Sequence, residues 1–554
     1  MTPEQLSTAV RDVLTGLVER GALALPDGPP ERVTVERPRQ QGHGDWATNV
    51  AMQLAKKAAT SPRELAELLA ADLREVDGVG AVEVAGPGFL NITVDAAAQG
   101  TLAAEIVAAG SSYGTSGAMA GQRVNVEFIS ANPTGPLHLG HTRWAVVGDA
   151  LARVLQAAGA VVAREFYIND RGNQMNLFGA SVEARALGRE VPENGYHGGY
   201  VADVAAEVVA ERPDLVDLEG TARTEAFREA AYAVQLRQQR DQLERFGTRF
   251  DVWFSERSLH ESQDVATGLE TLREQGHLFD ADGALWMRTT DFDDDKDRVL
   301  IKSDGDLTYF ASDTAYYVDK RRRGFDVCVY LLGADHHGYV NRLRAMAACA
   351  GDDPDRNIEV LIGQLVKIMK DGEELKLSKR AGTLVTLEEL VDLIGVDALR
   401  YTLSRYPADS PLTLDVAEMT KQSSDNPVFY VQYAHARVAS LIRNAADLGL
   451  APDPAAFDPS LLTHEKEGAL LRTLAELPRV VAGAAELREP HRVARYLEEL
   501  AGDYHRFYDA CRVLPQGDEE PGDLHRARLV LVAATRTVLA NGLELLGVSA
   551  PERM

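Results

Sequence analysis

Two histidines three residues apart lie in a short loop between a predicted strand and a predicted helix. His138 and His141 flank Leu139 and Gly140 in the sequence His-Leu-Gly-His. Where a loop enters a helix, the first N–H groups are unpaired and the helix dipole is positive, which suits a bound phosphate. Imidazole N–H groups at this point can donate hydrogen bonds to phosphate oxygens as negative charge develops. Because the motif is short, it also fits an ordinary loop, and a second element is needed to decide.

The residues on either side of this loop predict the elements that hold it. Val124, Val126 and Phe128 alternate with polar residues, which is typical of a strand. After the histidines, apolar residues recur at helical spacing, at Trp144, Val147, Leu151, Val154 and Leu155. A second strand is predicted near 161–167 and ends in the polar run 168–174. Ligands bind at the carboxyl ends of strands in open α/β sheets, so both loops are candidate binding segments.

The order of elements predicts several domains around an α/β core with a parallel sheet. We expect an N-terminal α+β domain at 1–108, the α/β domain at 109–406 and an all-α helical bundle at 407–554. A helical insertion is expected at about 176–290, after which the sheet resumes with strands at 298–302, 326–332 and 358–362. The bundle is expected to contain at least four long helices, at 427–445, 461–485, 490–511 and 523–546.

Charge and composition limit the classes of function. The chain has 554 residues, a formal net charge of −26 and three cysteines with no Cys-x-x-Cys pair. This acidic balance disfavours non-specific nucleic-acid binding, so an RNA partner would need local basic surfaces such as 320–323 and 367–380. The cysteine pattern predicts neither a zinc site nor a disulfide framework. With no signal-peptide pattern and charged residues within the apolar segment 529–548, we expect a cytoplasmic protein without a membrane partner.

The histidine loop has a counterpart far along the chain, and the two together resemble the signatures of a known family. The run 376–380 reads Lys-Leu-Ser-Lys-Arg, and in this order the pair is similar to that of class I aminoacyl-tRNA synthetases. Leu377 and Arg380 replace the family's usual methionine and serine. Further runs sharpen the resemblance to arginyl-tRNA synthetases over nearly the whole chain: 126–128, 131–141, 167–174, 309–313, 333–336, 395–401, 429–437 and 546–554. The resemblance implies a Rossmann-like catalytic core with one signature on each half.

The resemblance also implies a reaction and an ATP site. The expected reaction is ATP-dependent activation of L-arginine to arginyl-adenylate and its transfer to tRNA(Arg), with release of AMP and pyrophosphate. The implied catalytic residues are His138, His141, Lys376 and Lys379, with Lys379 at the family's catalytic lysine position. The implied ATP-binding residues are His138, Gly140, His141, Gly333, Asp335, His336, Lys376, Ser378 and Lys379. We expect ATP as a substrate that carries Mg²⁺, few or no protein ligands to that ion, and no zinc.

Arginine recognition requires groups that match a guanidinium, which presents a planar fork of donors that carboxylates bind bidentately. By resemblance, Glu127 and Asp313 bind this fork with help from the Tyr309 hydroxyl. Asn132 and His138 are the implied partners of the α-amino and carboxylate ends. Without the resemblance, Glu127 also fits a strand-surface carboxylate and Asp313 a helix cap.

The flanking domains acquire a role in the same way. In the family, the N-terminal domain contacts the elbow of the tRNA and the helical C-terminal domain reads the anticodon. Side chains that could contact splayed bases here are Tyr430, Tyr433, His435 and Tyr504, although each also fits a core position. The family further suggests a monomer.

Three other functions share parts of this pattern. A nucleotidylyltransferase has the same histidine loop and adenylyl chemistry but does not need a helical bundle of this size. A class I synthetase for another amino acid would differ at Glu127, Tyr309 and Asp313. A non-catalytic paralogue that only binds RNA would be expected to lack His138, His141 or Lys379, and all of these are present.

Overall fold

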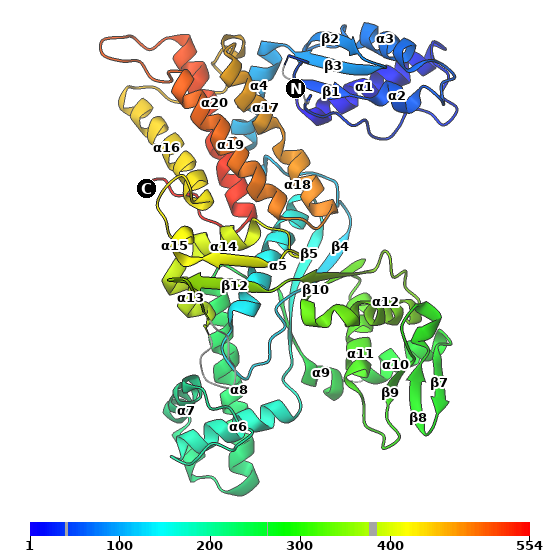
Figure 1. Cartoon of the computed structure of the whole chain (residues 1–554), viewed down its shortest axis with the longest axis vertical. Helices are drawn as coiled ribbons and strands as arrows, with labels where there is room; N and C mark the ends of the chain where they lie inside the picture. Colours follow the sequence, from blue (N-terminus) through cyan, green and yellow to red (C-terminus); the bar gives the residue numbers. More distant parts are fainter. Residues whose placement is uncertain (39–41, 263, 376–384) are drawn as a thin grey trace.

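The structure is a computed structural model of the chain and describes residues 1–38, 42–262, 264–375 and 385–554. Figure 1 shows an N-terminal domain at one end, a helical bundle beside it, and an α/β domain that extends to the opposite end. Within the described ranges, no helix is both long and apolar enough to span a membrane. All three predicted kinds of domain are present, which confirms the expected fold class.

The α/β domain is built on a parallel sheet of five strands in the order β11-β10-β4-β5-β6. Their bounds are Arg123–Glu127 (β4), Val161–Ile168 (β5), Val252–Ser255 (β6), Val327–Gly333 (β10) and Ile358–Gly363 (β11). From β4 the chain moves outward through β5 to β6, and then returns to the other side of β4 to form β10. Where the strand order reverses in this way, the carboxyl ends of the neighbouring strands leave a crevice for a ligand. Glu127 of β4 pairs with Tyr330 of β10 at this crevice.

Helix α5 (Leu139–Ala157) connects β4 to β5, as the sequence predicts. The apolar positions expected to face the sheet are all buried: Trp144, Val147, Leu151, Val154 and Leu155. The α-helices between β6 and β11 are α9 (Glu256–Glu261), α10 (Asp264–Glu274), α11 (Tyr309–Arg322) and α12 (Val340–Cys349). Helix α11 lies against β9 and α10 and leads directly into β10, so it brings its side chains to the crevice.

The insertion and the small strands differ from the predicted pattern. Strand β6 lies inside the range expected to be an insertion, yet it pairs with β5 in the main sheet. Strand β9 (Arg298–Ile301) was expected to continue the parallel sheet, but it pairs antiparallel with β8 (Ala284–Met287), which also pairs with β7 (Leu278–Ala281). A short strand pattern identifies a strand but not its partner, which explains the error. The helical insertion itself consists of α6 (Asn173–Ala186), α7 (Gly199–Glu211) and α8 (Gly220–Arg245).

A second, smaller sheet joins the α/β domain to the bundle. It has the order β13-β12-β14, with bounds Val366–Lys370 (β12), Glu373–Glu374 (β13) and Leu412–Asp415 (β14). Three helices accompany it: α13 (Leu387–Ile394), α14 (Val396–Ser404) and α15 (Val416–Met419). Helices α13 and α14 both contact α5, so this connection reaches the helix that carries the histidine motif.

The N-terminal domain packs three helices on an antiparallel sheet of the order β1-β3-β2. Its elements are α1 (Pro3–Glu19), β1 (Trp46–Thr48), α2 (Val50–Leu54), α3 (Pro62–Leu73), β2 (Val79–Ala85) and β3 (Phe89–Val94). The next helix, α4 (Ala96–Ala109), packs on α17 and α20 of the bundle, as Figure 1 also shows. This helix therefore attaches the N-terminal domain to the C-terminal one.

The C-terminal bundle contains five helices in its described residues: α16 (Pro427–Asp447), α17 (Glu465–Ala475), α18 (Leu477–Glu486), α19 (His491–Ala510) and α20 (Asp523–Leu545). The helix expected at 461–485 is divided into α17 and α18. Pro478 lies in the first turn of α18, where a proline fits because its missing N–H has no helical partner. The proline was the signal for this division.

Candidate active site

The loop after β4 leaves the sheet through an unusual backbone turn. Ile129 and Ser130, which follow Glu127 and Phe128, have φ angles of 73° and 47°. Non-glycine residues rarely adopt positive φ, least of all a β-branched residue such as isoleucine, so this turn is strained. Strain of this kind is often found at functional sites, and here it redirects the chain toward the histidine motif.

The two histidines cap the N-terminus of α5, as the spacing predicts. His138 is the N-cap residue, and its Nδ1 accepts a hydrogen bond from Gly140 N at 3.2 Å. The Nδ1 of His141 accepts from His138 N at 3.2 Å, and the two ring centroids are 3.8 Å apart. When Nδ1 accepts, Nε2 carries the proton of a neutral imidazole, so the donor of each ring is its Nε2. A Cβ atom at Gly140 would lie 3.1 Å from His138 Cε1, so the glycine lets the ring fold over the helix end.

The insertion fixes the loop between the strained turn and the histidines. Gln239 of α8, which is fully buried, donates to Asn132 O at 3.1 Å and to Gly135 O at 2.8 Å. Tyr200 of α7 donates to Thr134 O at 2.9 Å. The Asn132 side chain donates to Gln174 Oε1 of α6 at 2.5 Å. All three insertion helices thus hold the loop that contains the candidate residue Asn132.

Three predicted residues of the second signature, Lys376, Ser378 and Lys379, lie outside the described residues. The residues after them are placed beside the first signature. Leu387 N donates to Leu137 O at 2.9 Å, and Thr386 forms an isolated bridge with His138. The chain just beyond 376–384 therefore pairs with the residues that lead into the histidine motif.

A cavity of about 310 Å³ opens at the crevice between β4 and β10, next to this loop. Its lining combines two carboxylates with four tyrosines, one histidine and two leucines: Glu127, Asp313, Tyr167, Tyr316, Tyr330, Tyr339, His336, Leu332 and Leu343. The structure therefore brings together Glu127 and Asp313, which are far apart in the sequence (313 − 127 = 186 positions). Two carboxylates in a largely aromatic cavity suit a flat organic cation.

The two carboxylates have different surroundings. The pKa of Asp313 is raised to about 6, mainly because burial disfavours its charged form; a hydrogen bond from Tyr339 opposes this rise and the nearby charge of Glu127 adds to it. Glu127 is held from both sides: Lys320 Nζ donates to its Oε2 at 2.6 Å, and the Ser130 hydroxyl donates to its Oε1 at 2.9 Å. Within the described residues, Asp313 thus forms no ion pair, whereas Glu127 is fixed by Lys320 and Ser130.

Of the other residues predicted to bind ATP or arginine, only some lie in the lining of this cavity. His336 is in its lining, whereas Gly333 and Asp335 lie at the end of β10 and in the turn that follows. Tyr309 starts α11 and is 77% exposed, and it lines a neighbouring cavity of about 420 Å³ with Glu256. The structure therefore does not bring Tyr309 into the lining that contains Glu127 and Asp313.

Sequence reasoning missed most of the cavity wall. Asp313, Tyr316 and Lys320 follow one another on α11 at spacings of three and four residues, which places them on one helix face. This spacing was a usable signal. Tyr167 and Tyr330 are wall residues because β5 and β10 flank β4, and no local pattern reports which strands become neighbours.

One residue of the predicted polar run 168–174 is structural. Asp170 is 1% exposed, and its carboxylate accepts hydrogen bonds from the Tyr232 hydroxyl at 3.0 Å and the Ser255 hydroxyl at 2.6 Å. It also accepts from Arg257 N at 3.1 Å. Asp170 therefore joins the end of β5 to the insertion and to β6.

The aromatic residues proposed to contact tRNA separate into two groups. Tyr504 is fully buried, and His435 is 2% exposed with its Nδ1 2.9 Å from Pro551 O, so both belong to the core of the bundle. Their burial does not support the predicted stacking on bases. Tyr433 is 40% exposed and Tyr430 is half-buried. Arg437 lies over the rings of Tyr433 and Tyr508, at 5.6 Å and 3.9 Å, which leaves an accessible aromatic and cationic face on α16.

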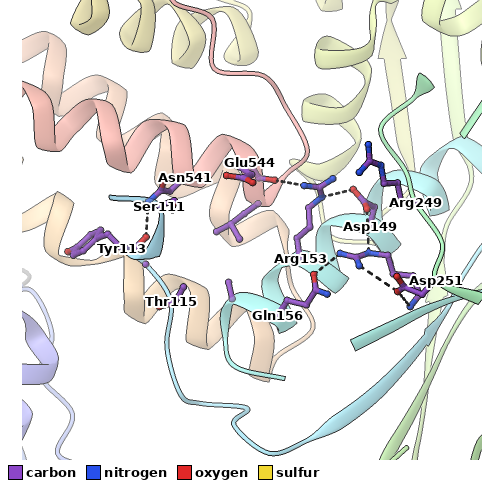
Figure 2. A pocket seen from close by; sticks show the side chains of 14 residues that line it. Ser111, Tyr113, Thr115, Asp149, Arg153, Gln156, Arg249, Asp251, Asn541 and Glu544 are labelled. Atoms are coloured by element: carbon purple, nitrogen blue, oxygen red, sulfur yellow. Dashed lines mark hydrogen bonds and ion pairs between the residues drawn. The ribbon is translucent and has the colours of Figure 1, made fainter. Parts of the chain in front are cut away.

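A second pocket, of about 540 Å³, lies where α5 meets α20 and the segment 111–115 (Figure 2). In its wall, Arg153 donates to Asp149 at 2.8 Å and to Glu544 O at 3.3 Å. Asn541 donates to Tyr113 O at 2.9 Å. Behind the wall, the buried Arg400 of α14 pairs with Asp149 and donates to Leu546 O at 3.2 Å. This network joins the helix of the histidine motif to the last helix of the bundle.

Three family models match successive parts of the chain. They are described as the arginyl tRNA synthetase N terminal domain, over residues 4–94, the catalytic domain of class I (R) tRNA synthetases, over 104–402, and the DALR anticodon binding domain, over 431–554. The catalytic model and the parallel sheet with its histidine-capped helix define a class I tRNA synthetase.

Full-length relatives narrow this class. Arginine–tRNA ligases from Kineococcus radiotolerans and Frankia alni are 58% and 59% identical to the chain, with complete coverage of both sequences. The chain therefore belongs to the arginine–tRNA ligase family. Among solved structures, arginyl-tRNA synthetases from Thermus thermophilus and Plasmodium falciparum match the whole chain with TM-scores of 0.74 and 0.71, at 23% and 16% identity, which supports the same fold.

Proposed function

We propose that the chain activates L-arginine with ATP and transfers it to tRNA(Arg), and that the 310 Å³ cavity is the arginine site. The observation that supports this most strongly is the position of Glu127 and Asp313, from separate elements, in one aromatic cavity at the end of the strand that leads into the histidine motif. A guanidinium can bind both carboxylates at once and lie against the tyrosine rings.

In the proposed first step, the arginine carboxylate attacks the α-phosphorus of ATP, which gives arginyl-adenylate and pyrophosphate. The chain positions the two substrates and stabilises the developing charge rather than forming covalent bonds. His138 and His141 donate from Nε2 to the phosphate oxygens at the N-terminus of α5, where the helix dipole helps. Lys376 and Lys379 are proposed to hold the pyrophosphate with its Mg²⁺, and Asn132 to hold the amino end of arginine. In the second step, a hydroxyl of the tRNA 3′ end attacks the activated carbonyl and AMP leaves.

The proposed tRNA contacts use the two terminal domains. On the bundle, Tyr430 and Tyr433 with Arg437 form the face for anticodon bases, because rings and guanidinium groups stack on splayed bases. The N-terminal domain is proposed to contact the elbow. We further propose that the enzyme is cytoplasmic and acts as a monomer. Sedimentation at catalytic concentration would check the oligomeric state.

Exchange of labelled pyrophosphate into ATP tests the proposal directly. The assay is run with each amino acid in turn, with and without tRNA(Arg), and we expect exchange with arginine when tRNA is present. A reaction with no arginine-dependent exchange under either condition would exclude the proposed function. Exchange driven equally by lysine would instead exclude the assignment of Glu127 and Asp313 as a guanidinium site, because a compact ammonium lacks the fork.

A further inference from the structure

Lys320 is a fully buried cation directly behind the wall of the proposed arginine cavity. Its side chain is 0% exposed and its Nζ donates to Glu127 Oε2 at 2.6 Å. The same ammonium lies 4.3 Å from the ring centroid of Tyr316 and 3.9 Å from that of Tyr330. All three of its partners line the cavity, whereas Lys320 itself does not.

The surroundings keep this ammonium in place. The Tyr316 hydroxyl donates to Glu165 at 2.7 Å, and Arg323 donates two hydrogen bonds of 2.8 Å to the same carboxylate. Glu165 is fully buried. A second layer of paired charges thus supports the wall, and such support fixes the side chains that meet a ligand.

Lys320 changes what Glu127 can offer to a ligand. One carboxylate oxygen of Glu127 already binds an ammonium, the other accepts from Ser130, and the residue lines the cavity. The two carboxylates of this wall, Glu127 and Asp313, together with the ammonium of Lys320 carry a net charge of minus one. A monovalent ligand matches that net charge, but it must contact two separated carboxylates rather than one strong anion.

We propose that Lys320 is a specificity-determining residue that makes the cavity select a guanidinium over an ammonium side chain. The inference rests on the proposed function, since it assumes that arginine occupies this cavity. A guanidinium is planar and delocalised, and its fork can reach both carboxylates. An ammonium is a compact point charge that gains most from a single concentrated anion, and Lys320 removes that anion by neutralising Glu127.

The test compares two constants in arginine-dependent pyrophosphate exchange with tRNA present. One is the KM for arginine, and the other is the inhibition constant of L-lysine as a competitor. We expect Lys320→Met to lower the ratio of the lysine constant to the arginine KM at least tenfold, with the KM for ATP unchanged. Lys320→Gln, which keeps a polar side chain but removes the charge, is expected to lower the ratio likewise. A loss of stability alone would reduce activity without moving this ratio, so an unchanged ratio in either folded variant overturns the inference.

A double-mutant cycle with Glu127→Gln shows whether Lys320 acts through Glu127. In the Glu127→Gln background, Lys320→Met should leave the ratio unchanged, because the partner charge is already absent. An equal fall of the ratio in both backgrounds would overturn the inference. Two other outcomes would count against the proposed function rather than against the role of Lys320. One is an arginine KM that stays at the wild-type value in Glu127→Gln. The other is a wild-type enzyme that shows no arginine-dependent exchange.

Discussion

Two buried ion pairs of the α/β domain, Glu127–Lys320 and Asp149–Arg400, differ in their surroundings, because the first borders the proposed arginine cavity and the second is almost completely buried. In the first pair, the lysine is fully buried while the Glu127 side chain is 10% exposed and lines the proposed arginine cavity. In the second, the side chains of Asp149 and Arg400 are 1% and 0% exposed. Arg400 also donates to Phe246 O at 3.1 Å and to Leu546 O at 3.2 Å, at the ends of α8 and α20.

The difference teaches why one pair uses lysine and the other arginine. An ammonium is a point charge that neutralises Glu127 and contacts two rings, which is sufficient to balance a ligand site. A guanidinium has five N–H donors in a rigid fork, so a single Arg400 can join α5, α8 and α20. The first pair supports the wall of the proposed arginine site, and the second holds three parts of the chain together.

The largest expected effect is that of Arg400→Met on stability. Removing one partner of a buried pair costs about 3–5 kcal/mol when the other charge is left uncompensated, and the contacts of Arg153 and Arg164 with Asp149, at 2.8 and 3.7 Å, place the expected cost at the lower end of this range. We expect the free energy of unfolding in urea to fall by about this amount, while the ratio of the lysine inhibition constant to the arginine KM stays at its wild-type value. Arg536→Met is the control, because Arg536 pairs with Glu552 on the surface and such pairs contribute about 1 kcal/mol or less. Equal losses in the two variants would contradict the assigned role of Arg400.

Asp313→Asn is expected to act in the opposite way, on the substrate and not on the fold. A charged hydrogen-bonded contact contributes about 1.5–3 kcal/mol, so kcat/KM for arginine should fall roughly 100-fold. The KM for ATP should stay within about twofold of the wild type, since Asp313 lines the proposed arginine cavity. Asp352→Asn is a matched control, because Asp352 binds Tyr317 and Arg321 elsewhere on α11. If ATP and arginine use fall together in Asp313→Asn, a structural role is the better explanation.

The pH dependence of arginine binding provides the next, smaller effect. The pKa of Asp313 is about 6, and the groups that face it are Tyr339, Glu127, Arg342 and His336. Arginine remains a cation throughout, so binding requires the ionised carboxylate, and the arginine KM should be constant above about pH 7. It should then rise as the pH falls through 6, by roughly tenfold at pH 5, because protonation increases tenfold for each pH unit.

His336 also lines the cavity, so a variant must separate its contribution from that of Asp313. The rise of the arginine KM should persist in His336→Gln and disappear in Asp313→Asn. A rise that is lost in His336→Gln would assign the titration to the histidine instead.

Local patterns predicted the part of the site that depends on neighbouring residues in the chain. The alternation from Val124 to Phe128 and the helical spacing from Trp144 identified β4 and α5, and the structure confirms both. His138 is placed at the helix N-terminus for the same reason. The location of Pro478 shows a local signal that was present but not used.

The cavity wall could not be predicted because it depends on which elements become neighbours. Tyr330 reaches Glu127 only because the chain returns past β4 to form β10, after a long excursion through β6, α10 and α11. Lys320 was read as part of a basic surface, whereas burial against Glu127 makes it an internal cation. Its position seven residues after Asp313 on α11 indicated a shared face, but nothing local indicated that the face would be inside.

The smallest expected effect tests whether the junction depends on its buried arginine. Arg153 also contacts Asp149, at 2.8 Å, but its side chain is 27% exposed and its bonds to Glu544 O and Gly247 O are 3.3 and 3.4 Å long. Because Arg400 still neutralises Asp149 in Arg153→Met, the free energy of unfolding should fall by only about 1 kcal/mol. In the Arg400→Met background the same change should cost more, since Asp149 then keeps, among the described residues, only the more distant Arg164, at 3.7 Å, and this excess measures the coupling of the two arginines. Strictly additive losses would mean that the two arginines act independently. If Arg153→Met lost as much stability as Arg400→Met, the buried Arg400 would be no more important to the junction than the partly exposed Arg153.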